Sequence, residues 1–271
     1  MSDLTNVISE LARKSTAREN PGDFKRDGLL YCGKCGMSKE CRVDFGDGQM
    51  VVGSICLCEK KAIEREKEKQ ALRERMLNAL NLRVQGIQDR AMHRYTFAAA
   101  EESRNIARCR AYAERWPEML ANNAGLLFWG DVGVGKTYAA ACIANAVIDR
   151  GAPVLMTSFP KILNSGWDKA EIADQMKHFQ LLVIDDLGVE RESDYALEIV
   201  QLVVDERYKS GMPAIVTTNL TLKELENPKN LRYARIYDRV LEMCVPVYFD
   251  GPSRRQEKRK DKLRLAREVF G

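Results

Sequence analysis

From about Tyr95 onward, short apolar runs alternate with stretches whose apolar residues follow helical spacing. The runs are rich in aliphatic side chains and lack the polar alternation of half-exposed strands, which is typical of strands buried on both faces. Buried strands that alternate with helices predict an α/β fold built on a parallel sheet with both faces covered. The five predicted strands are Leu126–Trp129, Val154–Thr157, Leu181–Ile184, Ala214–Thr218 and Val245–Phe249.

The N-terminal third of the chain follows a different pattern. Residues 4–18 suit a short amphipathic helix, and residues 31–58 are rich in Cys and Gly. Residues 59–92 are charged with scattered apolar positions, a composition typical of a long exposed helix that joins two bodies. We therefore expect three parts, which are a small N-terminal domain over 1–60, a helical linker over 61–93 and an α/β domain over 94–271.

Composition and charge exclude several classes of protein. The 271 residues are 45% hydrophobic and 30% charged, which rules out global disorder. The net charge of only +4 does not by itself indicate a nucleic-acid-binding protein. The residues after Pro252 are, however, strongly basic and predicted to be helical. No apolar run is long enough to span a membrane, and Met1–Asn6 does not resemble a secretory signal, so we expect a cytoplasmic protein.

The strongest candidate chemistry follows the first predicted strand. Residues 130–137 match the pattern G-x-x-x-x-G-K-[ST], with a strand before it and a helix after it. Backbone N–H groups at such a helix start stabilise phosphate, Lys136 can reach the terminal phosphates, and the Thr137 hydroxyl can ligate Mg²⁺. A chance match in a glycine turn would not explain these flanks. The predicted nucleotide-binding residues here are Gly130, Asp131, Val132, Gly133, Val134, Gly135, Lys136, Thr137 and Tyr138.

Polar residues also end the third and fourth predicted strands. Asp185 and Asp186 follow the apolar run that begins at Leu181. We expect Asp185 to hold Mg²⁺ and Asp186 to lie where a base polarises the attacking water. Asn219 follows the next strand, where its amide can hydrogen-bond the γ-phosphate or the water. The alternatives are a polar pair that merely ends a strand and an Asn that begins a turn.

Four segments combine into one recognisable pattern, namely Gly130–Thr137, Leu181–Gly188, Thr217–Asn219 and Arg235–Arg239. This combination resembles AAA+ ATPases and, more narrowly, the bacterial and phage replicative helicase loaders of the DnaC/DnaI type. The resemblance covers roughly residues 94–256 and the cysteine region more loosely. It implies a P-loop NTPase fold with a five-stranded parallel sheet and a C-terminal lid reduced to about one helix. It also implies slow, partner-stimulated ATP hydrolysis, because Asp186 stands where many such ATPases have Glu.

The resemblance also implies roles for arginines. Arg239 matches the family's arginine finger, which acts on the ATP of a neighbouring subunit, and Arg235 lies four residues earlier on the same helix face. The alternative for Arg239 is a helix arginine in a salt bridge. Arg255 matches the arginine that senses the nucleotide within its own subunit, although the adjacent Arg254 leaves this choice open.

Five of the eight cysteines lie close together in the sequence. Cys32 and Cys35 form one pair and Cys56 and Cys58 a second, with Cys41 as a spare. Four thiolates would give Zn²⁺ a closed tetrahedral shell, the arrangement of a structural site. An iron–sulfur cluster and free thiols are the alternatives. The remaining cysteines, in apolar surroundings, are expected to be buried: Cys109, Cys142 and Cys244.

The predictions of binding partners rest on the resemblance alone. It implies that residues 1–60 grip a hexameric replicative helicase of the DnaB type, that the chain assembles with itself on the helicase ring, and that the ATPase domain binds single-stranded DNA. Two alternatives stay open, namely a transposition helper ATPase of the IstB type and a nucleotide-gated adaptor with little turnover. The candidate DNA contacts, of which the aromatic ones can equally be core residues, are Phe159, Lys161, Ser193 and Tyr195.

Overall fold

The computed structural model describes residues 17–45, 48–188, 193–228 and 230–270. The chain divides into two compact units, Met1–Glu74 and Arg75–Gly271, and the division falls inside the predicted linker. Most of the helix predicted for residues 4–18 lies outside the described residues. No helix within the described residues is both long and apolar enough to cross a lipid bilayer.

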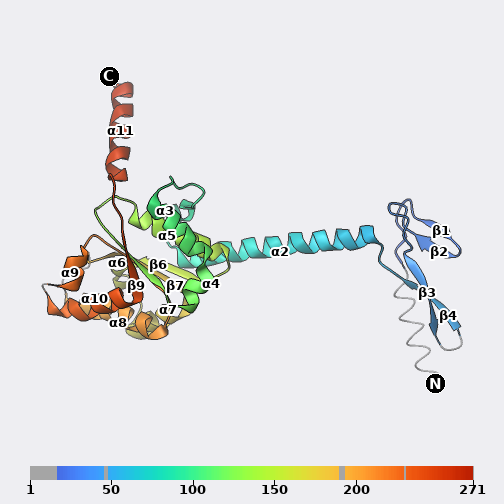
Figure 1. The fold of residues 1–271 in the computed structure, drawn as a ribbon, viewed down its shortest axis with the longest axis horizontal. Coiled ribbons are helices and arrows are strands. Elements are labelled where there is room, and N and C mark those ends of the chain that lie inside the picture. The colour runs from blue at the N-terminus through green and yellow to red at the C-terminus, as the bar shows by residue number, and fades with distance from the viewer. Residues whose placement is uncertain (1–16, 46–47, 189–192, 229, 271) are drawn as a thin grey trace. The chain divides into compact units, whose positions relative to one another are not determined.

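A five-stranded parallel sheet forms the centre of the second unit (Figure 1). Its strand order is β6-β7-β8-β5-β9, so the chain crosses over between neighbouring strands rather than forming hairpins. Each predicted apolar run is a strand, which confirms the predicted fold class. The strands are β5 (Gly125–Trp129), β6 (Val154–Ser158), β7 (Leu181–Leu187), β8 (Ala214–Thr218) and β9 (Cys244–Tyr248).

Two hydrophobic cores cover the two faces of this sheet. Side chains alternate between them, so Phe128 packs into one core and its neighbour Leu127 into the other. The first core is closed by α3 (Arg104–Glu114), α4 (Trp116–Ala121) and α5 (Lys136–Asp149). The second is closed by α6 (Phe159–Leu163), α7 (Lys169–His178), α8 (Asp194–Ser210), α9 (Leu222–Glu226) and α10 (Leu231–Met243).

The long helix α2 (Leu57–Gly86) ends where it meets the sheet. Gly86 lies against β6 so closely that a Cβ atom would be 1.7 Å from the Val154 carbonyl oxygen. The next residue, Ile87, then forms a parallel bridge with Met156 at the outer edge of β6. A short 3₁₀ helix, η1 (Arg90–Arg94), follows. The sequence pattern predicts a helix up to residue 92, and this contact explains why it stops earlier.

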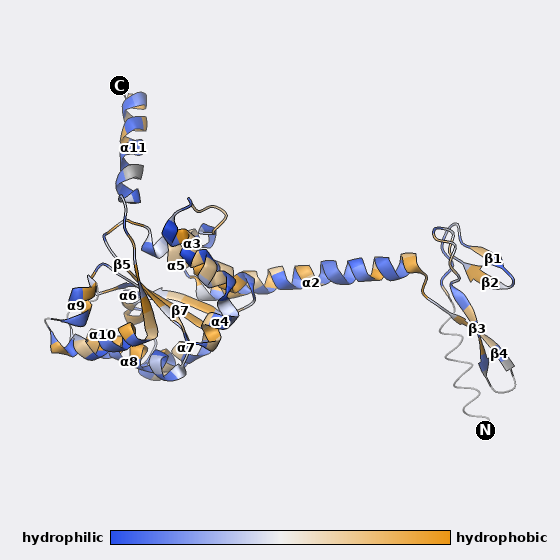
Figure 2. Cartoon of the chain, viewed as in Figure 1, coloured by the Kyte–Doolittle hydropathy of each residue, from blue (hydrophilic) through white to orange (hydrophobic). Residues whose placement is uncertain are grey.

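The opposite edge of the sheet is strand β9. Phe249 N–H donates to the Trp129 carbonyl, so alternate residues of β9 face β5 and the others face outward. Pro246 occupies an outward position and has no N–H to offer. The outward carbonyl of Tyr248 accepts a hydrogen bond from the Asn105 amide at 3.0 Å. After β9 the chain ends in α11 (Arg254–Phe270), which is helical as predicted and largely hydrophilic (Figure 2).

The first unit contains two antiparallel hairpins. Strands β1 (Phe24–Arg26) and β2 (Leu29–Tyr31) form one, and β3 (Glu40–Phe45) and β4 (Gly48–Gly53) form the other. In the first hairpin both turn residues, Asp27 and Gly28, have positive φ, the backbone that matches the twist of a two-residue hairpin loop.

A buried ion pair holds part of the first unit together. Lys39 Nζ lies 2.6 Å from Asp23 Oδ2, and both side chains are almost completely buried. Lys39 also donates to the Arg18 carbonyl, and Asp23 accepts from the backbone N–H of Gly33 at 3.0 Å. Each buried charge therefore has partners, which its burial requires.

Candidate functional site

The glycine-rich loop connects the end of β5 to the start of α5. Gly130, Gly133 and Gly135 all have positive φ, which side chains other than glycine rarely tolerate. At Gly133 space is also lacking, because a Cβ atom would lie 2.2 Å from Ser253 Oγ. The loop therefore folds back on itself and ends at the N-terminus of a 14-residue helix, where backbone N–H groups and the helix dipole stabilise an anion.

Lys136 extends back across this loop. Its ammonium group donates to the carbonyls of Gly130 and Asp131, each at 2.7 Å, and to Asn219 Oδ1 at 2.8 Å. Burial lowers the pKa of Lys136, while the carboxylates around it oppose that shift. This contact joins Asn219, at the end of β8, to the loop, and its predicted contact with the γ-phosphate or the water stays a prediction.

Asp185 links the two halves of the predicted magnesium site. Its Oδ1 accepts a hydrogen bond from Thr137 Oγ1 at 2.7 Å and another from Thr217 Oγ1 at 2.7 Å. A hydroxyl and a carboxylate this close are oxygen donors of the kind that Mg²⁺ prefers, so the residues present fit the ion. The sequence reasoning did not single out Thr217.

Asp186 adopts a left-handed backbone conformation, with φ of 59°. Burial raises the pKa of its carboxyl group, and the neighbouring Asp185 raises it further. A carboxylate with a raised pKa is better suited to accept a proton than an ordinary surface Asp. This environment supports the predicted role of Asp186 as a base, which stays a prediction.

One cavity of about 620 Å³ brings most of the predicted nucleotide residues together. Gly130, Asp131 and Val134 belong to the same loop but do not line this cavity. The predicted residues that line it are Val132, Gly133, Gly135, Lys136, Thr137, Tyr138, Asp185, Asp186, Asn219 and Arg255.

At the aromatic end of this cavity, sequence reasoning predicted Tyr138 but missed Tyr95 and Met92. Tyr95 and Tyr138 face each other with ring centroids 4.7 Å apart, and Met92 lies beside them. The buried Asn145 amide donates to the carbonyls of Met92 and Tyr95 and so holds this wall in place. Apolar and aromatic side chains of this kind suit a planar base. No motif marks Met92 or Tyr95, because contacts with α5 bring them to the cavity.

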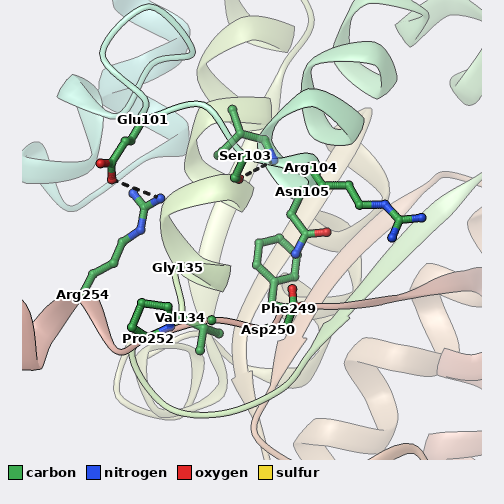
Figure 3. Close-up of a pocket in the computed structure, with 12 residues that line it drawn as sticks. Glu101, Ser103, Arg104, Asn105, Val134, Gly135, Phe249, Asp250, Pro252 and Arg254 are labelled. Carbon is green, nitrogen blue, oxygen red and sulfur yellow. Dashed lines mark hydrogen bonds and ion pairs between the residues drawn. The ribbon is translucent and has the colours of Figure 1, made fainter.

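Arg254 and Arg255 both line the cavity but have different surroundings. A neighbouring pocket of about 290 Å³ lies behind the loop, and there Arg254 forms an ion pair with Glu101 at 3.6 Å (Figure 3). The charge of Arg255 instead acts on Lys136 and Asp186, lowering the pKa of each. This arrangement favours Arg255 as the residue that senses the nucleotide, an assignment that stays a prediction.

Arg239 is engaged within its own chain. It forms an ion pair with Asp205, and its guanidinium lies 5.3 Å from the centre of the Tyr208 ring. It does not line the nucleotide cavity of this chain, as an arginine acting on a neighbouring subunit need not. Arg235, on the same helix, is exposed.

The structure places the candidate DNA-contacting residues in different environments. Phe159 is fully buried in the second core, so the prediction that it stacks on a base is wrong, because packing beneath α6 leaves no ring surface for a ligand. Lys161 is exposed on the same short helix. Ser193 caps α8 by accepting from the Ala196 N–H at 3.1 Å, and Tyr195 is 54% exposed. These three residues stay predictions.

The cysteine pairs meet in the first unit. The sulfur atoms of Cys32, Cys35 and Cys56 lie within 4.8 Å of one another, and Cys58 forms a side-chain hydrogen bond with Cys35. The pKa of Cys35 is lowered to about 7, chiefly by a hydrogen bond from the Met37 backbone. The thiol groups of these four cysteines are the donor type of a structural zinc site, so the residues present fit the ion. Cys41, exposed on β3, is not part of this group, and the zinc assignment stays a prediction.

Comparison with known proteins agrees with this geometry. The "Replicative helicase loader DnaC" of Escherichia coli (strain K12) is 32% identical over 143 residues, which is 50% of this chain and 56% of that protein. The "Replicative helicase loader DnaI" of Bacillus subtilis (strain 168) is 26% identical over 147 residues, 48% of this chain and 47% of that protein. The chain thus spans about half the length of the curated relatives it matches.

Structure and family comparisons point the same way. The solved structure "Crystal Structure of the DnaI" superposes with a TM-score of 0.51 at 25% identity, covering 61% of this chain and 93% of that one. The resemblance to AAA+ proteins of the DnaC/DnaI type is therefore confirmed. The family model described as "IstB-like ATP binding protein" matches residues 54–262. Because this match covers well over half of the sequence, the chain belongs to the family of IstB-like ATP-binding proteins.

Proposed function

We propose that this chain is an ATP-dependent loader that binds a hexameric replicative helicase of the DnaB type and delivers it onto single-stranded DNA. The observation that carries the ATPase part is the junction of Lys136, Thr137, Asp185 and Asn219 at one cavity. The similarity to helicase loaders supports the rest.

The residues of the cavity divide the work of hydrolysis among themselves. Thr137 and Asp185 would hold Mg²⁺, which neutralises the phosphate charge as the terminal phosphate leaves. Lys136 stabilises the same charge from the loop, and Asn219 orients the phosphate or the attacking water. Asp186 accepts the proton of the water. Its side chain is one methylene shorter than that of Glu, so we expect slow hydrolysis that speeds up in an assembly where Arg239 reaches the neighbouring nucleotide.

The proposed contacts with the helicase and with DNA follow from the positions of residues in the two units. The cysteine-containing N-terminal unit is the proposed helicase contact, as in the loader resemblance. Lys161 and Tyr195 are exposed on the ATPase unit and suit single-stranded DNA, Lys161 for a phosphate and Tyr195 for stacking on a base.

The decisive experiment compares the wild type with Lys136→Ala, using Lys169→Ala, an exposed lysine on α7, as the matched control. We expect Lys136→Ala to lose Mg·ATP binding and loading of a ring helicase onto circular single-stranded DNA, while the control keeps both. Normal loading by Lys136→Ala would refute an ATP-driven loader. Failure of the wild type to co-purify with a hexameric helicase would refute the partner.

A second candidate is a transposition helper ATPase, which the IstB-like family match favours. Such a protein would co-purify with a transposase instead of a hexameric helicase. A third, a nucleotide-gated adaptor, draws on Asp186 in place of Glu. An ATPase rate that stays negligible with and without single-stranded DNA, despite tight Mg·ATP binding, would favour it.

A further inference from the structure

We propose that the Thr217 hydroxyl is a positioning group of the ATP site, which fixes the side chain of Asp185 and the backbone of Asp186 at the same time. This proposal rests on the proposed ATP hydrolysis and adds to it a residue outside the loop and outside the strand that carries the carboxylates.

The hydrogen bonds of Thr217 define the role. Its Oγ1 donates to Asp185 Oδ1 at 2.7 Å and accepts from the Asp186 N–H at 2.9 Å. A hydroxyl has only one hydrogen to donate, and here that hydrogen goes to the carboxylate. The hydroxyl therefore connects the predicted magnesium ligand directly to the backbone of the predicted base.

The strand register explains why a side chain is needed here. From Leu182 to Ile184, β7 pairs residue by residue with β8, but the next pair joins Leu187 to Thr218. Two residues of β7, Asp185 and Asp186, therefore face the single position of Thr217. Such a bulge interrupts the backbone ladder and redirects side chains. The Thr217 hydroxyl supplies a hydrogen bond to the Asp186 N–H at this interruption.

The second threonine of β8 holds the other side of the bulge. Thr218 Oγ1 donates to the Leu187 carbonyl at 2.8 Å and accepts from the Leu220 N–H at 3.1 Å. Thr218 thus binds backbone only, whereas Thr217 also binds a carboxylate. The positive φ of Asp186 lies between these two attachments. An uncommon backbone conformation persists where surrounding contacts determine it.

Thr137 and Thr217, which both donate hydrogen bonds to Asp185, differ in their other predicted roles. Thr137 lies in the first turn of α5 and is itself a predicted magnesium ligand, so its hydroxyl oxygen has a second predicted role. Thr217 is fully buried in the sheet, and among the described residues the acceptor of its hydrogen is Asp185 alone. Some residues hydrogen-bond to a metal ligand without contacting the metal. Removing such a residue commonly lowers metal affinity or activity by about 10–100-fold.

Three variants of the full-length protein test the proposal. Thr217→Val keeps the branched shape and removes the hydroxyl, and Thr217→Ser keeps the hydroxyl and removes the methyl group. Thr157→Val is the matched control, because Thr157 is buried in β6, on the other side of β7, and lies opposite Ile184 rather than an aspartate. Each variant is measured for ATP hydrolysis against Mg²⁺ concentration, for affinity of a fluorescent ATP analogue with and without Mg²⁺, and for thermal midpoint.

We expect Thr217→Val to raise the Mg²⁺ concentration at half-saturation and to lower kcat, each by about 10-fold or more. Its nucleotide affinity in the absence of Mg²⁺ should stay within about twofold of the wild type, since the loop is untouched. Thr217→Ser should restore most of the Mg²⁺ response, and Thr157→Val should behave as the wild type.

Two outcomes would overturn the proposal. One is a wild-type Mg²⁺ response in Thr217→Val. The other is a Thr217→Ser variant as defective as Thr217→Val, which would mean that the residue acts through packing. A wild type that binds Mg·ATP without hydrolysing it would instead contradict the proposed hydrolysis, and the Mg²⁺ dependence of nucleotide affinity would still decide the role of Thr217.

Discussion

At the scale of single residues, the backbone of Asp186 limits which side chain can stand at the end of β7. Its φ of 59° lies in the left-handed region, which Asp and Asn tolerate better than most other side chains. A Glu at this position would reach further toward the γ-phosphate but would fit this backbone less well. The shorter carboxylate is therefore consistent with the bulge that holds it.

This conformation selects the variant that tests the base. Asp186→Asn keeps the left-handed backbone and removes the carboxylate, so we expect Mg·ATP binding to stay within about threefold of the wild type. Hydrolysis should fall by about 10²–10⁴-fold, the usual contribution of a general base. Single-turnover measurements with saturating Mg·ATP check this. An unchanged rate would remove Asp186 from the chemistry.

The buried pair of Asp23 and Lys39 predicts a pH dependence for the first unit. The hydrogen bond from Lys39 lowers the pKa of Asp23 from 3.8 to about 2. A lowered carboxyl pKa stabilises the fold at pH values above 3.8, and that stabilisation is lost as the pH falls toward 2. The protection factors of amides in residues 17–45, which correct for the slower intrinsic exchange at low pH, should therefore fall below about pH 4. In Asp23→Asn, which lacks the titrating group, they should change less over the same pH range.

At the scale of elements, α10 carries an arginine with two possible roles. Within the chain, Arg239 pairs with Asp205 and lies beside Tyr208, so a role on a neighbouring nucleotide requires it to leave Asp205. The ion pair with Asp205 and the predicted finger contact would therefore be alternative states of this side chain.

Two variants separate these states. We expect Arg239→Ala to keep Mg·ATP affinity in the isolated chain and to lower hydrolysis in the assembly by about 10³–10⁵-fold, the effect of losing an arginine finger. Asp205→Asn breaks the same ion pair but keeps the arginine, so assembled hydrolysis should persist. Equal losses in both variants would show that the ion pair matters only for folding.

The elements also show how far the sequence predicts this molecule. All five strands were predictable from their apolar runs, which stand out from charged surroundings. Four of them are largely buried, whereas the edge strand β9 has Val245 and Tyr248 exposed and was found from its apolar residues alone. The end of α2 at Gly86 was not, since it depends on the approach of Val154. The P-loop and Asp185 follow from local motifs. For Phe159 the sequence left a DNA contact and a core position open, because only tertiary packing decides where the first side chain of a short helix lies, and the structure places it in the core.

Contacts between distant segments account for the residues that sequence reasoning missed. Tyr95 reaches the cavity through the hydrogen bond from Asn145, fifty residues further along the chain. Thr217 belongs to a segment of the matched pattern, but the sequence gives it no role of its own, because only the bulge of β7 places Asp185 and Asp186 beside it. Neither relation leaves a spacing that a motif could capture.

At the scale of the whole molecule, the two units have separate interiors. Both hydrophobic cores consist of residues from Ala79 onward, and the grouped cysteines belong to the first unit. Loss of the proposed zinc should therefore affect the first unit without changing the nucleotide cavity.

This separation predicts the outcome of removing one ligand. Metal analysis of the wild type should find about one zinc per chain, as expected for a single four-thiolate site. Cys32→Ser should lower the zinc content and accelerate hydrogen exchange over residues 17–45, while Mg·ATP affinity stays within about twofold. A folded first unit with no zinc in the wild type would contradict the metal assignment.

The two edges of the sheet have a consequence for crowding in the cell. Ile87 partly covers the outer edge of β6, and Pro246 interrupts the hydrogen-bonding edge of β9, whose Tyr248 carbonyl is already bound. An exposed strand edge has unpaired backbone N–H and C=O groups to which other chains can add strands, which leads to aggregation. Because both sheet edges are partly blocked, copies at high local concentration can associate reversibly through their side chains. They should resist adding strands to one another and so resist forming amyloid-like aggregates.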